Sequence, residues 1–358
     1  MNETLQPWFW ELPKADLHCH LDGSLRIETL MALAREQGIR LGSDLPEELK
    51  RQLRLGMPCE NLADYLRAFS TTLSVLQEAA SLERVAFELA EDAHGENIRY
   101  IEVRYSPALH TERGLHLEEA VEAVLRGLCK AKQKYGIAFG VIVCTLRHFP
   151  LKTSMELAEV AGQFLGKGVV AFDLAGGEAQ FPGEPHKLAF ERAAKLGLGV
   201  TVHAGEAAGA DSVREALHSL KAQRIGHGVR LVEEAALEKE VLEKRIPLEC
   251  CPTSNVQTMA VAQLSSHPLK RFVQQGMCVT LNTDNRLVSD TTLSREYARA
   301  HFEMGMTLAQ LCGVARNGFE AAFMDEAPKQ QMLAQVDAQL QRMAKLAEQA
   351  PSKHPGPT

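Results

Sequence analysis

Residues 14–26 read KADLHCHLDGSLR, and this short stretch predicts the first strand of the fold and the turn that follows it. Residues 14–17 have the composition of a strand, which ends in His18, Cys19 and His20. Side chains two residues apart on a strand point to the same side of the sheet. His18 and His20 therefore face one way, and Cys19 faces the other. Two imidazoles that converge at a strand end are suitable first ligands for a divalent metal ion.

The residues after this strand predict a turn into a helix. Gly23 permits backbone angles that other residues resist. Ser24 is expected to cap a helix that begins near Ile27, with Glu28 close to the capping-box position. Taken alone, the HxH pattern fits a pair of surface histidines in such a turn as well as it fits a metal site. The rest of the chain has to decide between the two.

Farther along the chain, strand-like and helix-like segments alternate. Residues 98–105 (IRYIEVRY) alternate with a period of two, and residues 137–146 (IAFGVIVCTL) are a continuous run typical of a buried strand. The predicted strands are residues 15–18, 98–105, 137–146, 169–174, 199–203, 224–227, 247–250 and 278–283. The predicted helices are residues 27–38, 61–77, 81–96, 117–135, 154–165, 185–196, 211–220, 233–244 and 268–275, with more up to residue 348. Residues 39–59 look polar and irregular.

Because helix follows each predicted strand, the pattern predicts the α/β class with a parallel sheet. Eight such units predict a single (β/α)8 TIM barrel with extra helices after the first strand and at the C-terminus. A doubly wound open sheet is the alternative, but eight units would be unusual for it and no GxGxxG follows the first strand. Residues 1–350 are expected to form one barrel domain, and residues 351–358 a disordered tail.

The composition excludes several classes of partner. With a net charge of −7, the chain has no basic surface that favours nucleic acid or an anionic membrane, so neither is expected. The first residues, MNETLQPWFWELP, lack the basic and apolar regions of a signal peptide. The adjacent Cys250 and Cys251, and Cys19 between two candidate ligands, favour a reducing compartment, so we expect a cytoplasmic location. No CxxC pair is present, which argues against a cysteine-rich structural zinc site.

In a (β/α)8 barrel the functional residues lie at the carboxyl ends of the strands. Several predicted strands end in histidines or carboxylates with glycines beside them. These ends are His18, His20 and Asp22 of the first strand, then residues 173–178 (DLAGGE), 203–206 (HAGE), 224–228 (RIGHG) and 281–285 (LNTDN). Core packing explains such a gathering poorly, so we predict a reactive site at this end.

Three neutral imidazoles and one carboxylate are a ligand set that suits Zn²⁺. We assign His18, His20, His203 and Asp284 as the ligands of one zinc ion per chain. His203 by itself also fits a buried histidine bonded to the backbone, and Asp284 by itself fits a helix cap. The other candidate ligands at neighbouring strand ends favour the metal site.

Glu206 and His227 predict acid–base chemistry beside that metal. Glu206 lies one helical turn beyond His203, so it also fits a first-turn glutamate favoured by the helix dipole. Zinc lowers the pKa of a bound water to about 7. His227 can take the proton of the attacking water or hold the resulting hydroxide, and Glu206 can protonate the leaving side. The residues therefore predict metal-assisted hydrolysis, and spacing alone leaves the substrate open.

The motifs in their order along the chain resemble the adenosine deaminase family of the amidohydrolase superfamily. They are residues 14–26 (KADLHCHLDGSLR), 173–178 (DLAGGE), 203–209 (HAGEAAG), 224–230 (RIGHGVR), 251–255 (CPTSN) and 282–285 (NTDN), and the resemblance extends from about Leu12 to Phe323. It implies a zinc barrel that converts adenosine or 2′-deoxyadenosine and water to inosine or 2′-deoxyinosine and ammonia, in purine salvage. No lysine in these motifs is placed to bridge two metal ions, which favours a single zinc.

The resemblance also implies a role for each site residue. It makes His18, His20, His203 and Asp284 the zinc ligands, Glu206 the proton donor to purine N1, and His227 the residue that positions and activates the attacking hydroxide. It places His20, Asp22, Gly176 and Asn285 against the substrate, with Asp22 at the ribose 5′-hydroxyl and the backbone of Gly176 at N3.

Two positions depart from the family's commonest pattern. Asn285 stands where a second aspartate usually contacts purine N7, and Gly177 stands where aspartate is frequent. Both lie near the substrate, so adenine, an adenine nucleotide and a modified adenine nucleoside are alternatives to adenosine.

A secreted binding or signalling relative would be expected to have a signal peptide and a disulfide pattern, and the sequence indicates neither. A pseudoenzyme would be expected to lose a ligand, and all four candidate ligands are present. A hydrolase of amides or phosphoesters shares only the fold and is disfavoured by the order of the motifs.

Overall fold

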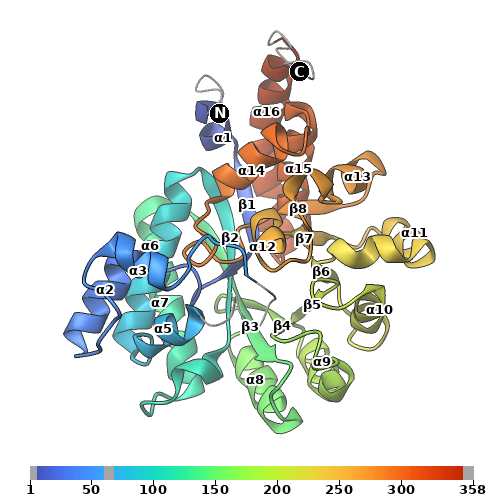
Figure 1. Ribbon diagram of the computed structural model, residues 1–358. Helices are drawn as coiled ribbons and strands as arrows, with labels where there is room; N and C mark the ends of the chain where they lie inside the picture. The colour runs from blue at the N-terminus through green and yellow to red at the C-terminus, as the bar shows by residue number, and fades with distance from the viewer. Residues whose placement is uncertain (1–5, 60–67, 350–358) are drawn as a thin grey trace.

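The computed structural model describes residues 6–59 and 68–349 (Figure 1). Its single sheet consists of β1 (Lys14–His20), β2 (Ile98–Tyr105), β3 (Ala138–Leu146), β4 (Val169–Ala175), β5 (Gly199–Ala204), β6 (Arg224–His227), β7 (Leu248–Cys250) and β8 (Val279–Leu281). Each strand pairs in parallel with the next one along the chain. The predicted (β/α)8 barrel is confirmed, and the doubly wound alternative is wrong because the strand order never reverses.

The barrel closes between the end of β8 and β1. The amide of Asp284 donates to the carbonyl of His18 at 2.8 Å, and the amide of His20 donates to the carbonyl of Asp284 at 2.7 Å. Helix α15 (Leu308–Ala321) packs on both strands. A Cβ on its Gly318 would lie 3.2 Å from the Cβ of Ala15, so glycine lets this helix approach closely. The closure therefore joins three predicted metal ligands through their own backbones.

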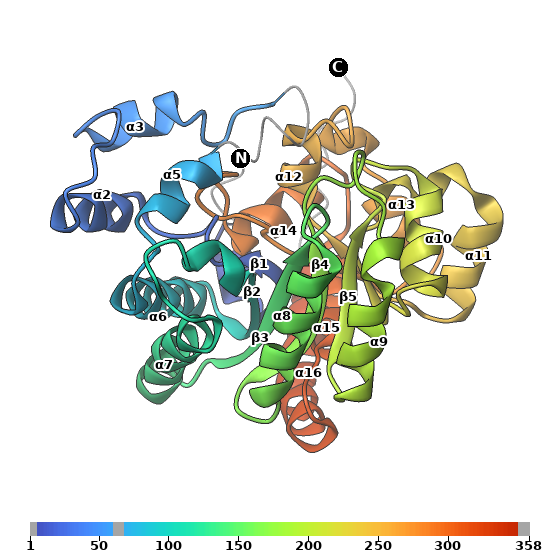
Figure 2. The ribbon, with the colours of Figure 1, turned by 90° about the horizontal axis from the view of Figure 1, so that it is seen from below.

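Helices surround the strands (Figure 1). Besides α15 they are α1 (Gln6–Glu11), α2 (Ile27–Glu36), α3 (Pro46–Gln52), α5 (Ala68–Ser74), α6 (Ala79–Gly95), α7 (Leu117–Tyr135), α8 (Leu151–Gln163), α9 (Lys187–Lys195), α10 (Ala210–His218), α11 (Ala235–Glu243), α12 (Pro252–Gln257), α13 (Leu269–Gln274), α14 (Leu293–Phe302) and α16 (Glu326–Gln349). Figure 2 shows α3, α5 and α12 together at one end of the barrel. Since α12 directly follows β7, this is the carboxyl end of the strands.

Two expectations for the loop after β1 are wrong. Ser24 does not cap α2, whose N-cap is Arg26 without a side-chain hydrogen bond; its hydroxyl instead accepts the amide of Arg286 at 3.0 Å and so ties this loop to the one after β8. Gly23 does not adopt a positive φ. Glycine is needed there for space, because a Cβ would lie 1.9 Å from Oδ1 of Asn285.

The stretch 39–59 is also less irregular than expected, because it contains helix α3. Pro46 stands in the first turn of that helix with two glutamates, and a lysine and an arginine stand in its last turn. These are helix signals that the polar composition obscured. Part of the predicted helix 61–77 and the predicted tail 351–358 lie outside the described residues. Within residues 6–59 and 68–349, helices long and apolar enough to cross a membrane are absent.

Candidate active site

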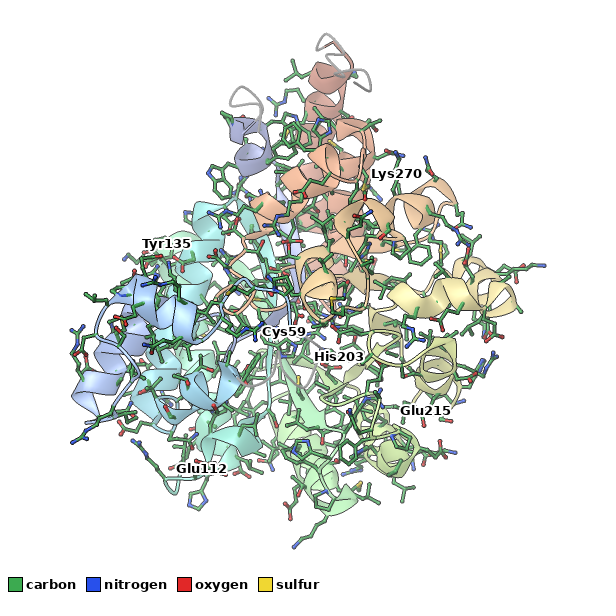
Figure 3. All side chains as sticks on the ribbon, in the orientation of Figure 1. Cys59, Glu112, Tyr135, His203, Glu215 and Lys270 are labelled. Atoms are coloured by element: carbon green, nitrogen blue, oxygen red, sulfur yellow. The ribbon has the colours of Figure 1, made fainter. Side chains whose placement is uncertain are left out.

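A cavity of about 240 Å³ opens among the carboxyl ends of the strands. Its walls include the predicted site residues His20, Asp22, Gly176, His203, Glu206, His227, Asp284 and Asn285, together with Gly177 and the apolar Phe69, Leu109 and Leu146. Figure 3 places His203 near the middle of the ring of helices, with Glu215 and Lys270 at its periphery. His18 is fully buried and does not line the cavity. The fold thus gathers residues that are almost 270 positions apart in the chain.

The four predicted metal ligands form one cluster, with all ligand atoms within 4.8 Å of one another. Nε2 of His20 lies 3.1 Å from Nε2 of His203. Oδ1 of Asp284 lies 3.5 Å from Nε2 of both His18 and His20. A tetrahedral zinc ion with bonds of about 2.0–2.1 Å separates its ligand atoms by about 3.3–3.4 Å. The spacing of the cluster fits such an ion.

Two of these histidines carry their proton on the ring nitrogen that leaves the other nitrogen free to bind a metal. Nδ1 of His18 lies 2.9 Å from a carboxylate oxygen of Glu249, and Nδ1 of His203 lies 3.1 Å from one of Asp173. Because a carboxylate accepts, each Nδ1 carries the proton, and each Nε2 presents its lone pair to the cluster. Nε2 of His18 has no hydrogen-bond partner within the described part of the chain. Burial lowers the pKa of His18 to about 4, which keeps it neutral.

Arg104 holds the two supporting carboxylates in place. Its guanidinium lies 3.1 Å from Asp173 and 2.8 Å from Glu249, and all three side chains are fully buried. Burial opposes ionisation, but His203 and Arg104 hold the pKa of Asp173 well below its usual range, and Arg104 does the same for Glu249. We did not assign Arg104 or Glu249 from the sequence. Their signal was a charge inside a predicted strand, where an unpaired charge would be costly.

Backbone geometry turns two of the site residues toward the cavity. His227 and Asp284 adopt φ values of 64° and 60°, a left-handed conformation that few residues other than glycine take. Such strain persists where the surroundings fix it, most often at functional sites. Gly226, before His227, leaves room for the His18 ring, since a Cβ there would lie 3.1 Å from its Cε1.

Glu206 and His227 lie side by side at the cavity. Oε1 of Glu206 accepts the hydroxyl of Thr258 at 3.0 Å, and its Oε2 lies 3.5 Å from Nε2 of His227. Burial raises the pKa of Glu206, which favours a protonated carboxyl group. Helix α10 begins only at Ala210, so Glu206 is not a first-turn glutamate. Glu178 holds this loop by accepting the backbone amides of residues 205–208 at 2.6–3.0 Å.

Two polar atoms at the opposite wall of the cavity lack partners. Oδ1 of Asp22 and Oγ of Ser106 are buried without a hydrogen bond to any residue that the structure describes. Asp22 follows β1 and Ser106 follows β2, so they lie on neighbouring strand ends. Burial raises the pKa of Asp22 to about 7. Buried polar atoms in proteins are normally paired, so this wall is suited to hydroxyl groups of a ligand. A lone serine after a strand gave no signal in the sequence.

Comparison with known proteins identifies relatives of this chain. The model of the family described as adenosine deaminase matches residues 13–339. An adenosine deaminase of Clostridium perfringens is 40% identical over 321 residues, which cover 90% of this chain and 97% of that protein. Among solved structures, adenine deaminase from Arthrobacter aurescens has a TM-score of 0.85 and 27% identity, covering 92% of this chain and 99% of that one. An Arabidopsis N6-mAMP deaminase has a TM-score of 0.83 and 27% identity, covering 93% and 99%.

Proposed function

This chain belongs to the adenosine deaminase family, and from that premise we propose that it hydrolyses adenosine and 2′-deoxyadenosine to inosine or 2′-deoxyinosine and ammonia. The observation that carries the proposal is the cluster of His18, His20, His203 and Asp284 beside Glu206 and His227 on one cavity. We propose that the cluster binds one zinc ion per chain. Zinc bound there would act as a Lewis acid and lower the pKa of a water molecule.

The order of the polar groups around the barrel supports a purine in the cavity. Glu206 follows β5, Gly176 follows β4, Asp22 and Ser106 follow β1 and β2, and Asn285 follows β8. Around the rim of a purine nucleoside, the atoms N1, N3, N9 with its sugar, N7 and C6 follow one another in this order. If N1 lies at Glu206, then N3 lies at Gly176, the sugar at Asp22 and Ser106, and N7 at Asn285. C6 then lies at the metal ligands.

In this arrangement the protein's own groups perform the proton chemistry. Glu206 donates a proton to N1, which makes C6 more electrophilic as the water oxygen attacks it. His227 lies next to Glu206 and contacts the attacking oxygen. The backbone amide of Gly176 meets N3. One proton of the attacking water then returns to the Glu206 carboxylate, and the other passes to the amino group on C6, which leaves as ammonia while C6 becomes the carbonyl carbon of inosine.

The wall formed by Asp22 and Ser106 supports a nucleoside rather than the free base. Two buried polar atoms are available for ribose hydroxyls, and adenine would leave them unpaired. The described cavity lining contains neither lysine nor arginine, so a 5′-phosphate would lack a counter-charge.

We expect adenosine and 2′-deoxyadenosine to have far higher kcat/KM values than adenine, AMP or N6-methyl-AMP. The test is a spectroscopic deamination assay of the purified enzyme against all five compounds. A preference for adenine would contradict the assignment of Asp22 and Ser106 to the ribose hydroxyls. Efficient turnover of either nucleotide would contradict the inference that the cavity offers no positive charge to a 5′-phosphate.

Asn285 is expected to replace the family's usual aspartate as the donor to purine N7. N7 only accepts hydrogen bonds, so a carboxyl group must be protonated to donate, whereas the asparagine amide donates as it is. Adenosine with carbon in place of N7 should therefore lose on the order of 1–3 kcal/mol in kcat/KM, because the donor is left unpaired. In an Asn285→Ala background this penalty should mostly vanish. An equal penalty in both backgrounds would mean that another group reads N7.

We also propose a single barrel domain over residues 1–350 and a cytoplasmic location. Cys19, Cys250 and Cys251 support a reducing compartment, because they are buried thiols within or beside the metal site. A fractionation of the source cells that places the activity elsewhere would contradict the location.

A further inference from the structure

A chain of hydrogen bonds leads from a backbone amide to His227. It begins where the amide of Leu269 donates to Nδ1 of His267 at 3.1 Å. A backbone amide only donates, so this Nδ1 carries no proton, and a neutral His267 carries its proton on Nε2. His267 is buried, and burial lowers its pKa to about 3, so the ring is neutral near pH 7.

The second link fixes the side-chain amide of Asn255. Nε2 of His267 lies 3.2 Å from Oδ1 of Asn255, and this oxygen is the acceptor that the Nε2 proton needs. The proton on Nε2 of His267 therefore fixes which way the side-chain amide of Asn255 points. Nδ2 of Asn255 consequently points the other way and lies 3.0 Å from Nδ1 of His227. Because an NH₂ group only donates, Nδ1 of His227 accepts and carries no proton.

We infer that Asn255 and His267 are positioning residues that fix the proton of neutral His227 on Nε2, the nitrogen that faces Glu206. Neither residue lines the described cavity, and the hydrogen bonds from His267 to Asn255 and from Asn255 to His227 connect both of them to the site. The consequence for the reaction rests on the proposed function. Of the two roles that the sequence leaves open for His227, this tautomer selects the second: it donates a hydrogen bond to the attacking oxygen and does not take the water's proton.

The same tautomer explains why His227 is not a metal ligand. Its ring nitrogen lies close enough to Asp284 and Cys251 for the three to share an ion. His18 and His203 have carboxylates at Nδ1 and so present a lone pair at Nε2. His227 has an amide donor at Nδ1, so its Nε2 is protonated and has no lone pair to offer. The partner at Nδ1 thus distinguishes His18 and His203, whose Nε2 presents a lone pair, from His227, whose Nε2 presents a proton.

The direct test is ¹⁵N NMR of the holoenzyme labelled at histidine, because two-bond ¹H–¹⁵N correlations distinguish protonated from unprotonated ring nitrogens. The His227 signals are those lost in His227→Gln. We expect an unprotonated Nδ1 and a protonated Nε2. His110 is an internal control of opposite tautomer, because its Nδ1 lies 2.8 Å from the carbonyl of Leu76, which only accepts. A protonated Nδ1 on His227 overturns the inference, whether or not the enzyme deaminates adenosine.

Two variants test the consequence. Asn255→Asp replaces the donor by an acceptor, so the His227 proton should move to Nδ1 and kcat should fall by roughly 10²–10⁴-fold, with KM changed only a few-fold. His267→Gln retains a donor to Asn255, so the tautomer and most of kcat should survive. If Asn255→Asp moves the proton but leaves kcat within a few-fold of wild type, the tautomer does not serve catalysis. If the wild type shows the expected spectrum but does not deaminate adenosine, the proposed function fails, and the inference that Asn255 and His267 fix the His227 tautomer stands.

Discussion

Replacement of Asp284 by asparagine is expected to remove most zinc affinity and to lower kcat/KM for adenosine by at least roughly 10²-fold. Groups that only support metal ligands typically contribute 10–100-fold, so a direct anionic ligand should contribute at least the upper part of that range. Asparagine tolerates the left-handed backbone at φ 60° and preserves both backbone hydrogen bonds to β1. The loss should therefore report the missing ligand rather than an opened barrel.

Metal content per chain after dialysis, together with kcat/KM, checks this expectation. Wild type should contain one zinc per chain and should lose activity on exhaustive chelation. Asp290→Asn is the matched control, because Asp290 also has a positive φ, of 47°, in the same loop but does not line the cavity. It should retain metal and activity. Two zinc ions per chain, or an active chelated enzyme, would contradict a single-zinc site.

Glu206→Gln is expected to fold and bind zinc normally but to lose roughly 10²–10⁴-fold in kcat, the usual contribution of a general acid. The glutamine oxygen can still accept the Thr258 hydroxyl, so the local packing should persist. What is lost is the proton for N1, which burial stabilises on Glu206 by raising its pKa.

Glu296→Gln is the matched control for Glu206→Gln. Glu296 is also buried, also accepts threonine hydroxyls and also has a pKa raised by burial, but it does not line the cavity. Its variant should keep kcat within a few-fold of wild type, with any cost appearing as a lower melting temperature. If Glu206→Gln behaves like this control, Glu206 is not the proton donor.

The sequence was sufficient for the order of strands because local pattern and chain order decide it. The predicted strand bounds match β2 (Ile98–Tyr105) and β6 (Arg224–His227) to the residue, and the predicted helix 117–135 matches α7 (Leu117–Tyr135). The failures include short helices. Helix α3 was missed because charged residues outnumber apolar ones there, so its sequence shows no apolar periodicity that would indicate a helix.

The sequence by itself also determined which residues gather at the site. His18, His20, His203, Asp284, Glu206 and His227 stand at strand ends, and a parallel barrel brings all strand ends to one face. That conclusion needs only chemical type and position along the chain. The resemblance then supplied their roles.

Only the tertiary structure decided what each of these groups has as a neighbour. Glu249 beside His18, Arg104 between two carboxylates, and Asn255 beside His227 come from different strands and helices. The position of a proton depends on the partner a few ångströms away, and no periodicity in the chain encodes that partner. The sequence therefore predicted which histidines lie at the site, and the fold decided which of them present a lone pair at Nε2 and which presents a proton there.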